Sequence, residues 1–439
     1  MVKRLGLGCL IGLVATLVFV AAVAAHAQRG SPVVYRISVE GPLTPVWITY
    51  IERSIGVAER DGAQALLLVL NTPGGQINLM QRIVEIIRAS QAPVIVYVSP
   101  RGASAASAGT LITLAGHASA MAPETTIGAA SPVGSEGQDI DETLERKIKE
   151  DIRALARALT ERRGEQATEL AEATIEEARA VFATEALEAG LIDFVATDRA
   201  DLLRQLDGFT VDVAGRPVTL KTAAAQVESL EMTLIEQILN RVVDPNILAL
   251  LLFIGVQAIL IELSNPGGWV AGFVGVISLG LAVYGLGILP INWLGLGLII
   301  LAFVLFVLDI KAPTHGALTI VGAITLIAGL LVLFSQPGVE EFGRLSIPLV
   351  IALGVGTALF FGFIVTQGLR AQRARPVTGV EGLIGSIGVA RGDLTPEGFV
   401  FVQGERWKAI AEDGEIKEGT SVQVIGIDGF RLKVRRAQS

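Results

Sequence analysis

Apolar and polar residues alternate along the first half of the chain in a way that predicts a mixed α/β domain. The segment VVYRISV (33–39) has the pattern of a strand, and two continuous apolar runs have the character of strands buried on both faces: ALLLVLN (65–71) and VIVYVS (94–99). Between them, apolar residues recur every three or four positions over residues 45–60 and 77–89, as on one face of a helix. Alternating strands and helices predict parallel βαβ units with right-handed crossovers.

Two further segments belong to this domain, which we place at residues 28–230. The charged stretch DETLERKIKEDIRALARALTERRG (141–164) has the pattern of an amphipathic helix. The segment TEALEAGLIDFV (184–195) predicts a short helix, a stop at Gly190 and then a strand. The domain is therefore expected to carry a long charged helix in addition to its βαβ units.

The pattern changes at about residue 231, and the region from there to residue 369 is strongly apolar. Most of its five apolar stretches are long enough to cross a hydrocarbon core of about 30 Å: 247–263, 269–289, 291–308, 318–334 and 346–366. The first carries Glu262 near its end and also fits an interfacial helix, so four spans are an alternative to five. Three arginines follow the last stretch, which predicts a cytoplasmic end by the positive-inside rule: Arg370, Arg373 and Arg375.

The N-terminus has the three parts of a secretory signal peptide. Two basic residues precede an apolar run over residues 5–24, and Ala25-His26-Ala27 fits a signal peptidase site. We expect residues 1–27 to be removed, with an uncleaved anchor as the alternative. In either case the domain that follows starts outside the cytoplasm. The chain is thus predicted to be an integral protein of the cell membrane, with an extracytoplasmic first domain and a cytoplasmic C-terminus.

The last part of the chain, residues 376–439, contains five short apolar runs separated by glycines. This pattern predicts a small all-β barrel of the OB kind. Many OB folds bind nucleic acid through a basic groove, but this segment has eight Lys and Arg against nine Asp and Glu. Four aromatic residues are expected in its core: Phe399, Phe401, Trp407 and Phe430. We therefore predict a protein-interaction module.

Composition narrows the functional classes further. The 439 residues carry a net charge of −8, which argues against nucleic-acid binding. A mean hydropathy of +0.58 is too high for an ordinary soluble protein of this length. The one cysteine, Cys9, excludes an intrachain disulfide and a thiolate metal cluster. No metal or cofactor is expected.

Two small-residue motifs follow neighbouring predicted strands. NTPGG (71–75) follows the second strand, and RGASAASAGT (101–110) follows the third. A helix is expected from about residue 105, with Ser107 near its positive end. The N–H groups of Gly74, Gly75 and Ala108 could then flank one oxyanion beside the Ser107 hydroxyl, which is the geometry of acyl transfer. The alternative is a plain turn and a tightly packed helix start, and Ser104 is assigned to that structural role.

A nucleophilic serine needs a base, and the chain has few candidates. Of the three histidines, His26 leaves with the signal peptide and His315 lies between membrane spans. His117 follows Ser107 by ten residues, which is about 15 Å along a helix, so a structural role is expected for it. A lysine with a lowered pKa is the alternative base. Lys147 and Lys149 are the two candidates, although lysines on such a charged helix are usually solvated.

The motifs TPGG, PRGASAASAG, MAPETTIGAASPV and TEALEAGLID, each in its place after a strand, resemble the ClpP-type serine proteases. The whole chain is similar to the long-form NfeD proteins, and GVEGLIGSIGVA and GERWKAIAEDG fit the NfeD barrel. The resemblance implies an α/β ClpP/crotonase-like domain of the ββα spiral type. An all-α polytopic membrane region and a small all-β OB barrel would follow it.

The resemblance also implies a Ser-Lys dyad. Ser107 matches the nucleophile, and Gly74, Gly75 and Ala108 match the oxyanion hole. Lys147 matches the lysine of bacterial relatives, whereas Arg157 stands where an archaeal relative has its lysine. An arginine stays protonated and cannot be the base, so Lys149 is the alternative to Lys147.

The family further implies cleavage of hydrophobic segments in membrane-associated proteins. It also implies a stomatin/prohibitin-type membrane partner and a homo-oligomer, a dimer or larger. Two other functions compete with this one. A non-catalytic scaffold that organises a stomatin-like partner would fit the same domains. A crotonase-like acyl-CoA enzyme would share the glycine-rich oxyanion hole, but CoA thioesters are cytoplasmic whereas this domain is predicted outside the cytoplasm.

Overall fold

The computed structural model describes residues 32–132, 142–264, 268–311, 314, 316–373 and 380–437. The predicted signal peptide and its cleavage site lie outside the described residues, as does Arg375. The chain divides into two compact units, of which the second contains the C-terminal barrel.

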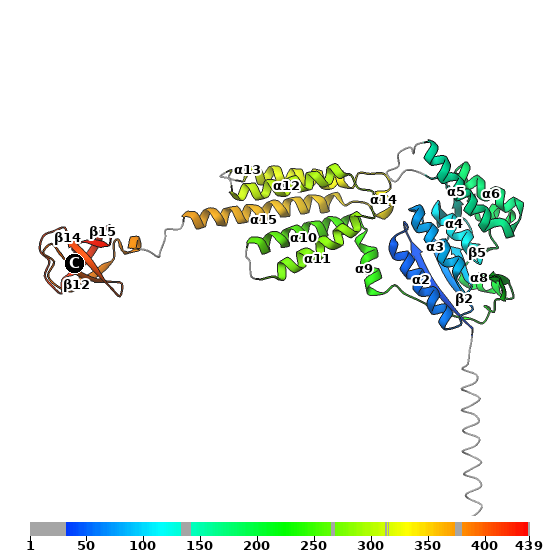
Figure 1. Ribbon diagram of the computed structural model, residues 1–439, viewed down its shortest axis with the longest axis horizontal. Helices are drawn as coiled ribbons and strands as arrows, with labels where there is room; N and C mark the ends of the chain where they lie inside the picture. Colours follow the sequence, from blue (N-terminus) through cyan, green and yellow to red (C-terminus); the bar gives the residue numbers. More distant parts are fainter. Residues whose placement is uncertain are drawn as a thin grey trace, which may run out of the picture. The chain divides into compact units, whose positions relative to one another are not determined.

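The first domain, in which Figure 1 labels the strands β2 and β5, is built on a six-stranded sheet in the order β11-β1-β2-β3-β5-β8. Its strands are β1 (Val33–Glu40), β2 (Ala65–Asn71), β3 (Val94–Val98), β5 (Ala118–Met121), β8 (Phe194–Val195) and β11 (Gln226–Ser229). All five pairings are parallel, as the alternation of strands and helices predicted. The central strands β2 and β3 are buried on both faces, which is why their sequences are continuous apolar runs.

Helices cover both faces of this sheet. The first five are α2 (Pro45–Arg60), α3 (Ile77–Ala89), α4 (Ala108–Ala115), α5 (Glu142–Thr160) and α6 (Glu165–Glu176), and α7 (Ala183–Glu188) and α8 (Arg199–Leu206) follow. Side chains of α2, α3 and α4 share one core with Leu66, Leu68 and Leu70 of β2. Leu67 points to the opposite face, where α8 and the hairpin β9 (Thr210–Val213) and β10 (Arg216–Thr219) cover it.

A second, three-stranded sheet lies beside the first and corrects one prediction. It consists of β4 (Ser104–Ala106), β6 (Thr126–Gly128) and β7 (Ala180–Phe182), with β4 parallel to β6. The expected helix start at about residue 105 is wrong, because α4 begins at Ala108. Residues 104–106 are held extended instead, since the backbone of Thr72 bonds to Ser104 and Ala106 on one side and β6 pairs with them on the other.

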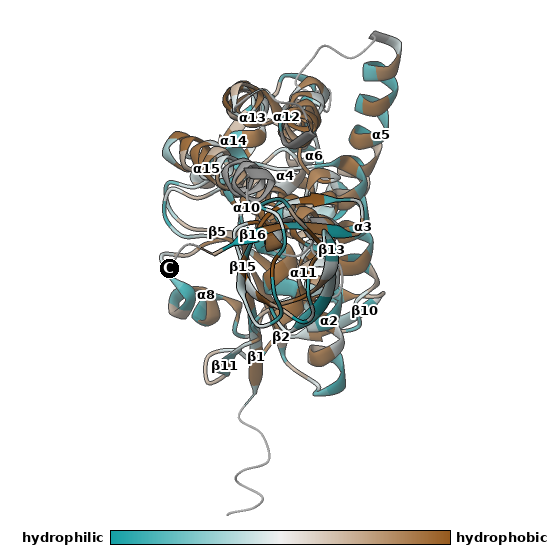
Figure 2. Ribbon diagram, turned by 90° about the vertical axis from the view of Figure 1, so that its left-hand side faces the viewer, coloured by the Kyte–Doolittle hydropathy of each residue, from teal (hydrophilic) through white to brown (hydrophobic). Residues whose placement is uncertain are grey.

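An apolar helical region follows the first domain. A short helix α9 (Leu234–Val242) leads into α10 (Pro245–Ser264), α11 (Val270–Leu286), α12 (Trp293–Lys311) and α13 (Ala317–Leu333), and α14 (Val339–Phe342) precedes α15 (Ile347–Arg373). The five long helices coincide with the five predicted apolar stretches. In Figure 2, α12 and α13 are almost wholly apolar, whereas α5 has one polar and one apolar face.

The length of these helices bears on the number of spans. Among the described residues, α10 over Pro245–Leu263 is the one helix both long and apolar enough to cross a membrane by itself. The other four long helices have apolar segments of 17 residues or fewer in the part that the structure describes. Glycines allow close packing between them, since a Cβ on Gly295 would lie 2.2 Å from the backbone nitrogen of Leu333. Whether four or five helices span stays a prediction.

The C-terminal unit contains a closed barrel with strand order β12-β13-β14-β16-β15, after a short 3₁₀ helix at Val380–Leu383. The strands are β12 (Ile387–Ala390), β13 (Glu397–Val402), β14 (Glu405–Ala411), β15 (Ser421–Asp428) and β16 (Arg431–Arg436). Five strands closed into a barrel confirm the predicted OB-like architecture.

The aromatic residues of this barrel do not all lie where we expected them. Phe430 is 89% exposed and Phe401 is 41% exposed, so their assignment to the core is wrong. The interior is filled by aliphatic side chains such as Val400 and Val424, which alternate along the strands with outward-facing residues. The guanidinium group of Arg406 stacks over Phe399 at 4.0 Å from the ring centroid, on the outer surface.

Candidate active site

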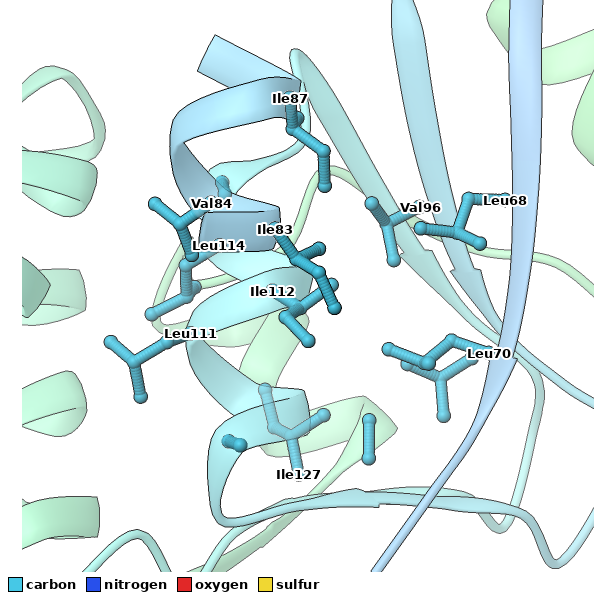
Figure 3. Close-up of a cluster of buried hydrophobic side chains, with 14 of the residues drawn as sticks. Leu68, Leu70, Ile83, Val84, Ile87, Val96, Leu111, Ile112, Leu114 and Ile127 are labelled. Carbon is cyan, nitrogen blue, oxygen red and sulfur yellow. The ribbon is translucent and has the colours of Figure 1, made fainter. Parts of the chain in front are cut away.

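The helix α4 is fixed firmly beneath the candidate nucleophile. Its side chains Leu111, Ile112 and Leu114 are each at most 2% exposed. Figure 3 shows Ile112 of α4 and Ile83 of α3 pointing toward Val96 and the other side chains of the sheet. Because close-packed cores deform little, the start of α4 has a defined position relative to the ends of β2 and β3.

Ser107 occupies the single residue between β4 and α4. Its backbone has φ 54° and ψ −120°, a conformation that residues other than glycine rarely adopt and that costs about 1–3 kcal/mol. The surrounding backbone holds it there: the Ser107 N–H donates to the carbonyl oxygen of Gly128 at 2.8 Å, and its carbonyl accepts from the Thr110 N–H at 3.0 Å. Such a turn between a strand and a helix presents a serine hydroxyl outward, as nucleophile elbows do.

The TPGG loop lies directly against this serine. A Cβ on Gly74 would lie 2.7 Å from the Ser107 Cβ, and Gly74 has φ 119°. A Cβ on Gly75 would lie 2.6 Å from the Cβ of Leu43. The Gly74 carbonyl accepts from the Leu43 N–H at 2.9 Å, which anchors the loop to the start of α2. Both glycines are therefore required by the close approach of three chain segments, as the motif suggested.

The three N–H groups that we assigned to an oxyanion hole are not equivalent. The Gly74 N–H donates to Thr72 Oγ1 at 3.0 Å and is therefore already bound. The N–H groups of Gly75 and Ala108 donate to no acceptor within the described part of the chain. Ala108 is the first residue of α4, where N–H groups lack intrahelical partners and the helix dipole favours negative charge. Gly74 supplies space beside Ser107, whereas Gly75 and Ala108 have N–H groups available for an anion.

The structure does not bring either candidate lysine to Ser107. Lys147 is exposed, and Lys149 Nζ lies 2.9 Å from Glu145 Oε1 on the same helix, α5. Among the described residues, the Ser107 hydroxyl has no hydrogen bond to either lysine. Both lysines lie in the first half of α5, which follows residues 133–141 outside the described ranges.

The second half of α5 is tied down by arginines instead. Arg157 forms an ion pair with Glu172 of α6, and hydrogen bonding from Arg157 lowers the pKa of the Glu172 carboxyl. Arg153 Nη1 lies 2.8 Å from Glu176 Oε1, also on α6. Arg157 thus has a structural partner at the position where we expected an archaeal relative to carry its lysine.

Sequence reasoning missed a partly buried ion pair just after this helix, in the 3₁₀ turn Glu161–Arg163. Arg163 donates to both carboxylate oxygens of Asp193 at 2.9 Å and to the Ser119 hydroxyl at 2.7 Å. Its side chain is 5% exposed. The sequence offers only a weak signal for it, a double arginine at the helix end. The pair fixes the end of α5 to β5 and to the segment that enters β8.

His117 has the structural role that its distance from Ser107 predicted. It is 3% exposed, and its Nδ1 accepts from the Val94 N–H at 3.0 Å. Burial, with smaller contributions from Arg88 and Arg162, lowers the pKa of the imidazole to about 4. The ring is therefore neutral at pH 7 and is occupied in holding α4 to β3.

The described residues also bear on metal chemistry. In the described ranges, His, Cys, Asp and Glu side chains form no group of three or more that could hold a metal ion. The groups around Ser107 are backbone amides, a hydroxyl and small side chains. This arrangement can stabilise an oxyanion beside the Ser107 hydroxyl. The hydroxyl becomes an effective nucleophile when a base reaches it.

Three family models match the chain in sequence order. They are the N-terminal domain of NfeD1b over residues 33–213, the NfeD integral membrane domain over residues 246–367, and the NfeD-like C-terminal, partner-binding domain over residues 380–436. The matches correspond to the α/β domain, the apolar helices and the barrel.

Relatives of known name align over almost the whole chain. The membrane-bound protease PH1510 of Pyrococcus horikoshii is 38% identical over 416 residues, covering 92% of this chain and 93% of the relative. The membrane protein NfeD1b of Bacillus subtilis is 26% identical over 435 residues, covering 93% and 94%. A solved structure of the 1510-N membrane protease specific for a stomatin homologue, also from Pyrococcus horikoshii, is 34% identical. It covers 48% of this chain and 98% of that one, with a TM-score of 0.41.

Proposed function

Because the chain belongs to the NfeD family of membrane proteins, we propose that it is a membrane-bound serine endopeptidase of the ClpP class. Its substrates are hydrophobic segments of membrane-associated proteins, and its partner is a stomatin/prohibitin-like membrane protein. The observation that carries the proposal is the strained Ser107 turn, with the N–H groups of Gly75 and Ala108 available beside it. A purely structural turn has no need of a costly backbone conformation at a serine.

The reaction proceeds through an acyl-enzyme. The Ser107 Oγ attacks the carbonyl carbon of the scissile peptide while a neutral lysine takes the hydroxyl proton. The N–H groups of Gly75 and Ala108 and the positive end of α4 stabilise the tetrahedral oxyanion. The lysine returns the proton to the departing amine, and water then attacks the ester by the same steps. Gly74 serves this site by leaving room for Ser107 and for the substrate backbone.

Lys147 is our first choice of base, and Lys149 is the alternative. Neither bonds to Ser107 among the described residues, so the first half of α5 must take another position in the active state. A homo-oligomer, in which a neighbouring copy orders this half of α5 over the serine, would supply that position. A lysine enclosed in such a contact loses water, which lowers its pKa and yields the neutral amine that a base requires.

A non-catalytic membrane scaffold is the second candidate function. The exposure of Lys147 and the ion pair of Lys149 favour it, because a serine without a base is a poor nucleophile. In that case the C-terminal barrel would bind the stomatin-like partner while the Ser107 turn stayed idle.

The test compares two serines that lie three residues apart. The full chain in proteoliposomes is incubated with apolar peptides as wild type, Ser107→Ala and Ser104→Ala. Ser104 is the matched control, because its hydroxyl accepts from Thr126 in the sheet beside the site. We expect Ser107→Ala to lose about 10⁴-fold or more in kcat/KM and Ser104→Ala to stay near wild type. Equal cleavage by all three proteins would exclude Ser107 as the nucleophile, and no cleavage by any oligomer would favour the scaffold.

The proposed topology places residues 28–230 outside the cytoplasm and the barrel inside it. Reporter fusions after residues 230 and 375 test this arrangement. Opposite signals at the two positions are expected for five spans, and matching signals would exclude any odd number of spans.

A further inference from the structure

The short helix α9, between the first domain and the apolar helices, exposes large apolar side chains. Leu234 is 73% exposed, Ile235 is 70% exposed and Ile238 is 44% exposed. Their spacing along the helix puts them on one face, which we call the α9 stripe. A patch of this kind on a helix of nine residues marks a contact surface.

The opposite face of α9 is bound to the first domain. Arg53 of α2 donates from Nη2 and Nε to the two carboxylate oxygens of Glu236, at 2.8 and 3.1 Å. Asn240, one turn further on, accepts from the Thr44 hydroxyl at 3.3 Å. Thr233 and Glu236 also form a capping box at the start of the helix. A bidentate pair fixes the rotation of the helix about its axis, so the α9 stripe is held facing away from this domain.

The α9 stripe runs directly into the membrane region. Val242, at the last turn of α9, lies on the same side as the stripe and is 3% exposed. It packs against α11, where a Cβ on Gly285 would lie 3.1 Å from the Val242 Cγ1. The helix α10, which has the length and composition of a membrane span, begins at Pro245. Figure 1 shows α9 at the ends of α10 and α11.

Residues typical of a membrane interface lie at the same end of this region. Because α11 ends at Leu286 and α12 begins at Trp293, the Trp293 side chain lies at the end of the helices where α9 is attached, and it is 70% exposed. Arg241 is exposed at the last turn of α9, on the flank of the stripe. Tryptophan gathers at the boundary between headgroups and acyl chains, and arginine there extends its charge toward the headgroups.

We propose that α9 is an interfacial helix that lays Leu234, Ile235 and Ile238 into the headgroup–acyl boundary of the bilayer. The occupant is lipid because the stripe leads through Val242 to the membrane helices, and the arginine beside it, Arg241, lies in the last turn of α9, next to the helices, where its charge can reach the headgroups. Since Glu236 and Asn240 hold the other face to the first domain, the bilayer surface sets the orientation of that domain above the membrane. This inference does not depend on peptidase activity.

Depth-dependent quenching in the full chain tests the proposal. Cys9 is replaced by serine, and single cysteines are placed at Leu234, Ile238 or Gln237 and labelled with a nitrobenzoxadiazole dye. The Ser107→Ala background is used, so that proteolysis cannot alter the sample. Gln237 is the matched control, because it is exposed on the same helix but outside the stripe. Each protein is reconstituted as single copies in phosphatidylcholine–phosphatidylglycerol nanodiscs, with and without a lipid that carries a nitroxide at carbon 5 of its acyl chain.

We expect the labels at Leu234 and Ile238 to be quenched at least about twice as strongly as the label at Gln237. The reason is that an interfacial helix inserts only its apolar face into the bilayer. Quenching that is equal at all three positions, or absent at all three, would overturn the proposal. A second arm mixes donor-labelled and acceptor-labelled copies in larger vesicles. Energy transfer between Ile238 sites that persists on lipid dilution, without nitroxide quenching, would identify a second copy as the occupant and would also overturn it. The three side chains replaced by cysteine are exposed, so the fold is expected to be retained in each labelled variant.

Discussion

The two sides of the candidate active site differ sharply in how they are held. Ser107 lies between a paired strand and a helix packed into the core, and the backbone of Gly128 and the Gly74 turn surround it. Lys147 and Lys149 lie in the first half of α5, and the ion pair of Lys149 in the described part of the chain is with Glu145 of the same helix. The candidate nucleophile and the candidate oxyanion donors are therefore positioned by the described fold, whereas neither candidate base is.

The contrast runs even through α5 itself. Ion pairs of Arg153 and Arg157 fix its second half to α6. Just after the helix, Arg163 forms a bidentate ion pair with Asp193. A helix anchored at one end can present its other end in more than one position. This arrangement suits a site that is completed when a substrate, a partner or another copy of the chain contacts the first half of α5.

The sharpest test of this comparison removes each lysine in turn. Lys147→Met and Lys149→Met are each compared with wild type in kcat/KM for an apolar peptide. We expect one of them to lose about 10³-fold, because general-base catalysis contributes about 10²- to 10⁴-fold. Both should unfold within about 0.5 kcal/mol of wild type, since neither side chain is in a core. If neither change reduces an activity that depends on Ser107, both lysines are excluded as the base.

On the nucleophile side, Gly74→Ala should damage both activity and stability. The new Cβ would lie 2.7 Å from the Ser107 Cβ at a backbone φ of 119°, so the turn must shift. We expect a loss of about 10²-fold in kcat/KM, because a misplacement of about 1 Å has that effect. The free energy of unfolding should fall by about 1–3 kcal/mol, as in other overpacked sites.

Gly102→Ala is the matched control for that variant. Gly102 also has a positive φ, of 76°, but a Cβ there would meet nothing within 4 Å. It should cost about 1 kcal/mol in stability through backbone strain alone and leave kcat/KM within a few-fold of wild type. Equal losses of activity in the two variants would show that strain, and not the contact with Ser107, limits the site.

A smaller effect is expected from His117, which holds α4 to β3: its protonation should make the free energy of unfolding depend on pH. Its pKa is about 4 in the folded chain against 6.5 as a free side chain, so between these values the unfolded state binds a proton that the folded state does not. Stability should therefore fall as pH drops from 6.5 toward 4, by up to about 1.4 kcal/mol per pH unit. His117→Asn keeps an acceptor for the Val94 N–H but does not titrate. Thermal unfolding of this variant should show a shallower pH slope, and an unchanged slope would contradict the assignment.

Much of the fold followed from local patterns. The apolar runs that became β1, β2 and β3 and the helical periods that became α2 and α3 each depend on side chains close together in sequence. The candidate nucleophile was also visible, because Ser107 follows a buried strand among small residues. The expected helix start at residue 105 failed because residues 104–106 pair with Thr72 and with β6, and no local pattern reveals pairing between distant segments.

By itself, the sequence determined the architecture: an α/β domain, a set of apolar helices and an OB-like barrel. Buried positions recur every two residues in a half-buried strand and every 3.6 residues in a helix, and they are continuous in a strand buried on both faces. These patterns involve residues close together in the chain, so they can be recognised in the sequence. Only the tertiary structure decided that the Gly74 N–H donates to the Thr72 hydroxyl, whereas the N–H groups of Gly75 and Ala108 have no acceptor among the described residues. It also decided that the bond of Glu236 to Arg53 leaves the apolar side of α9 facing away from the first domain. The bond between Arg53 and Glu236 joins residues 183 positions apart, and the short loop that contains the Gly74–Thr72 bond packs against Leu43 and Ser107. These contacts depend on where the fold brings the segments together.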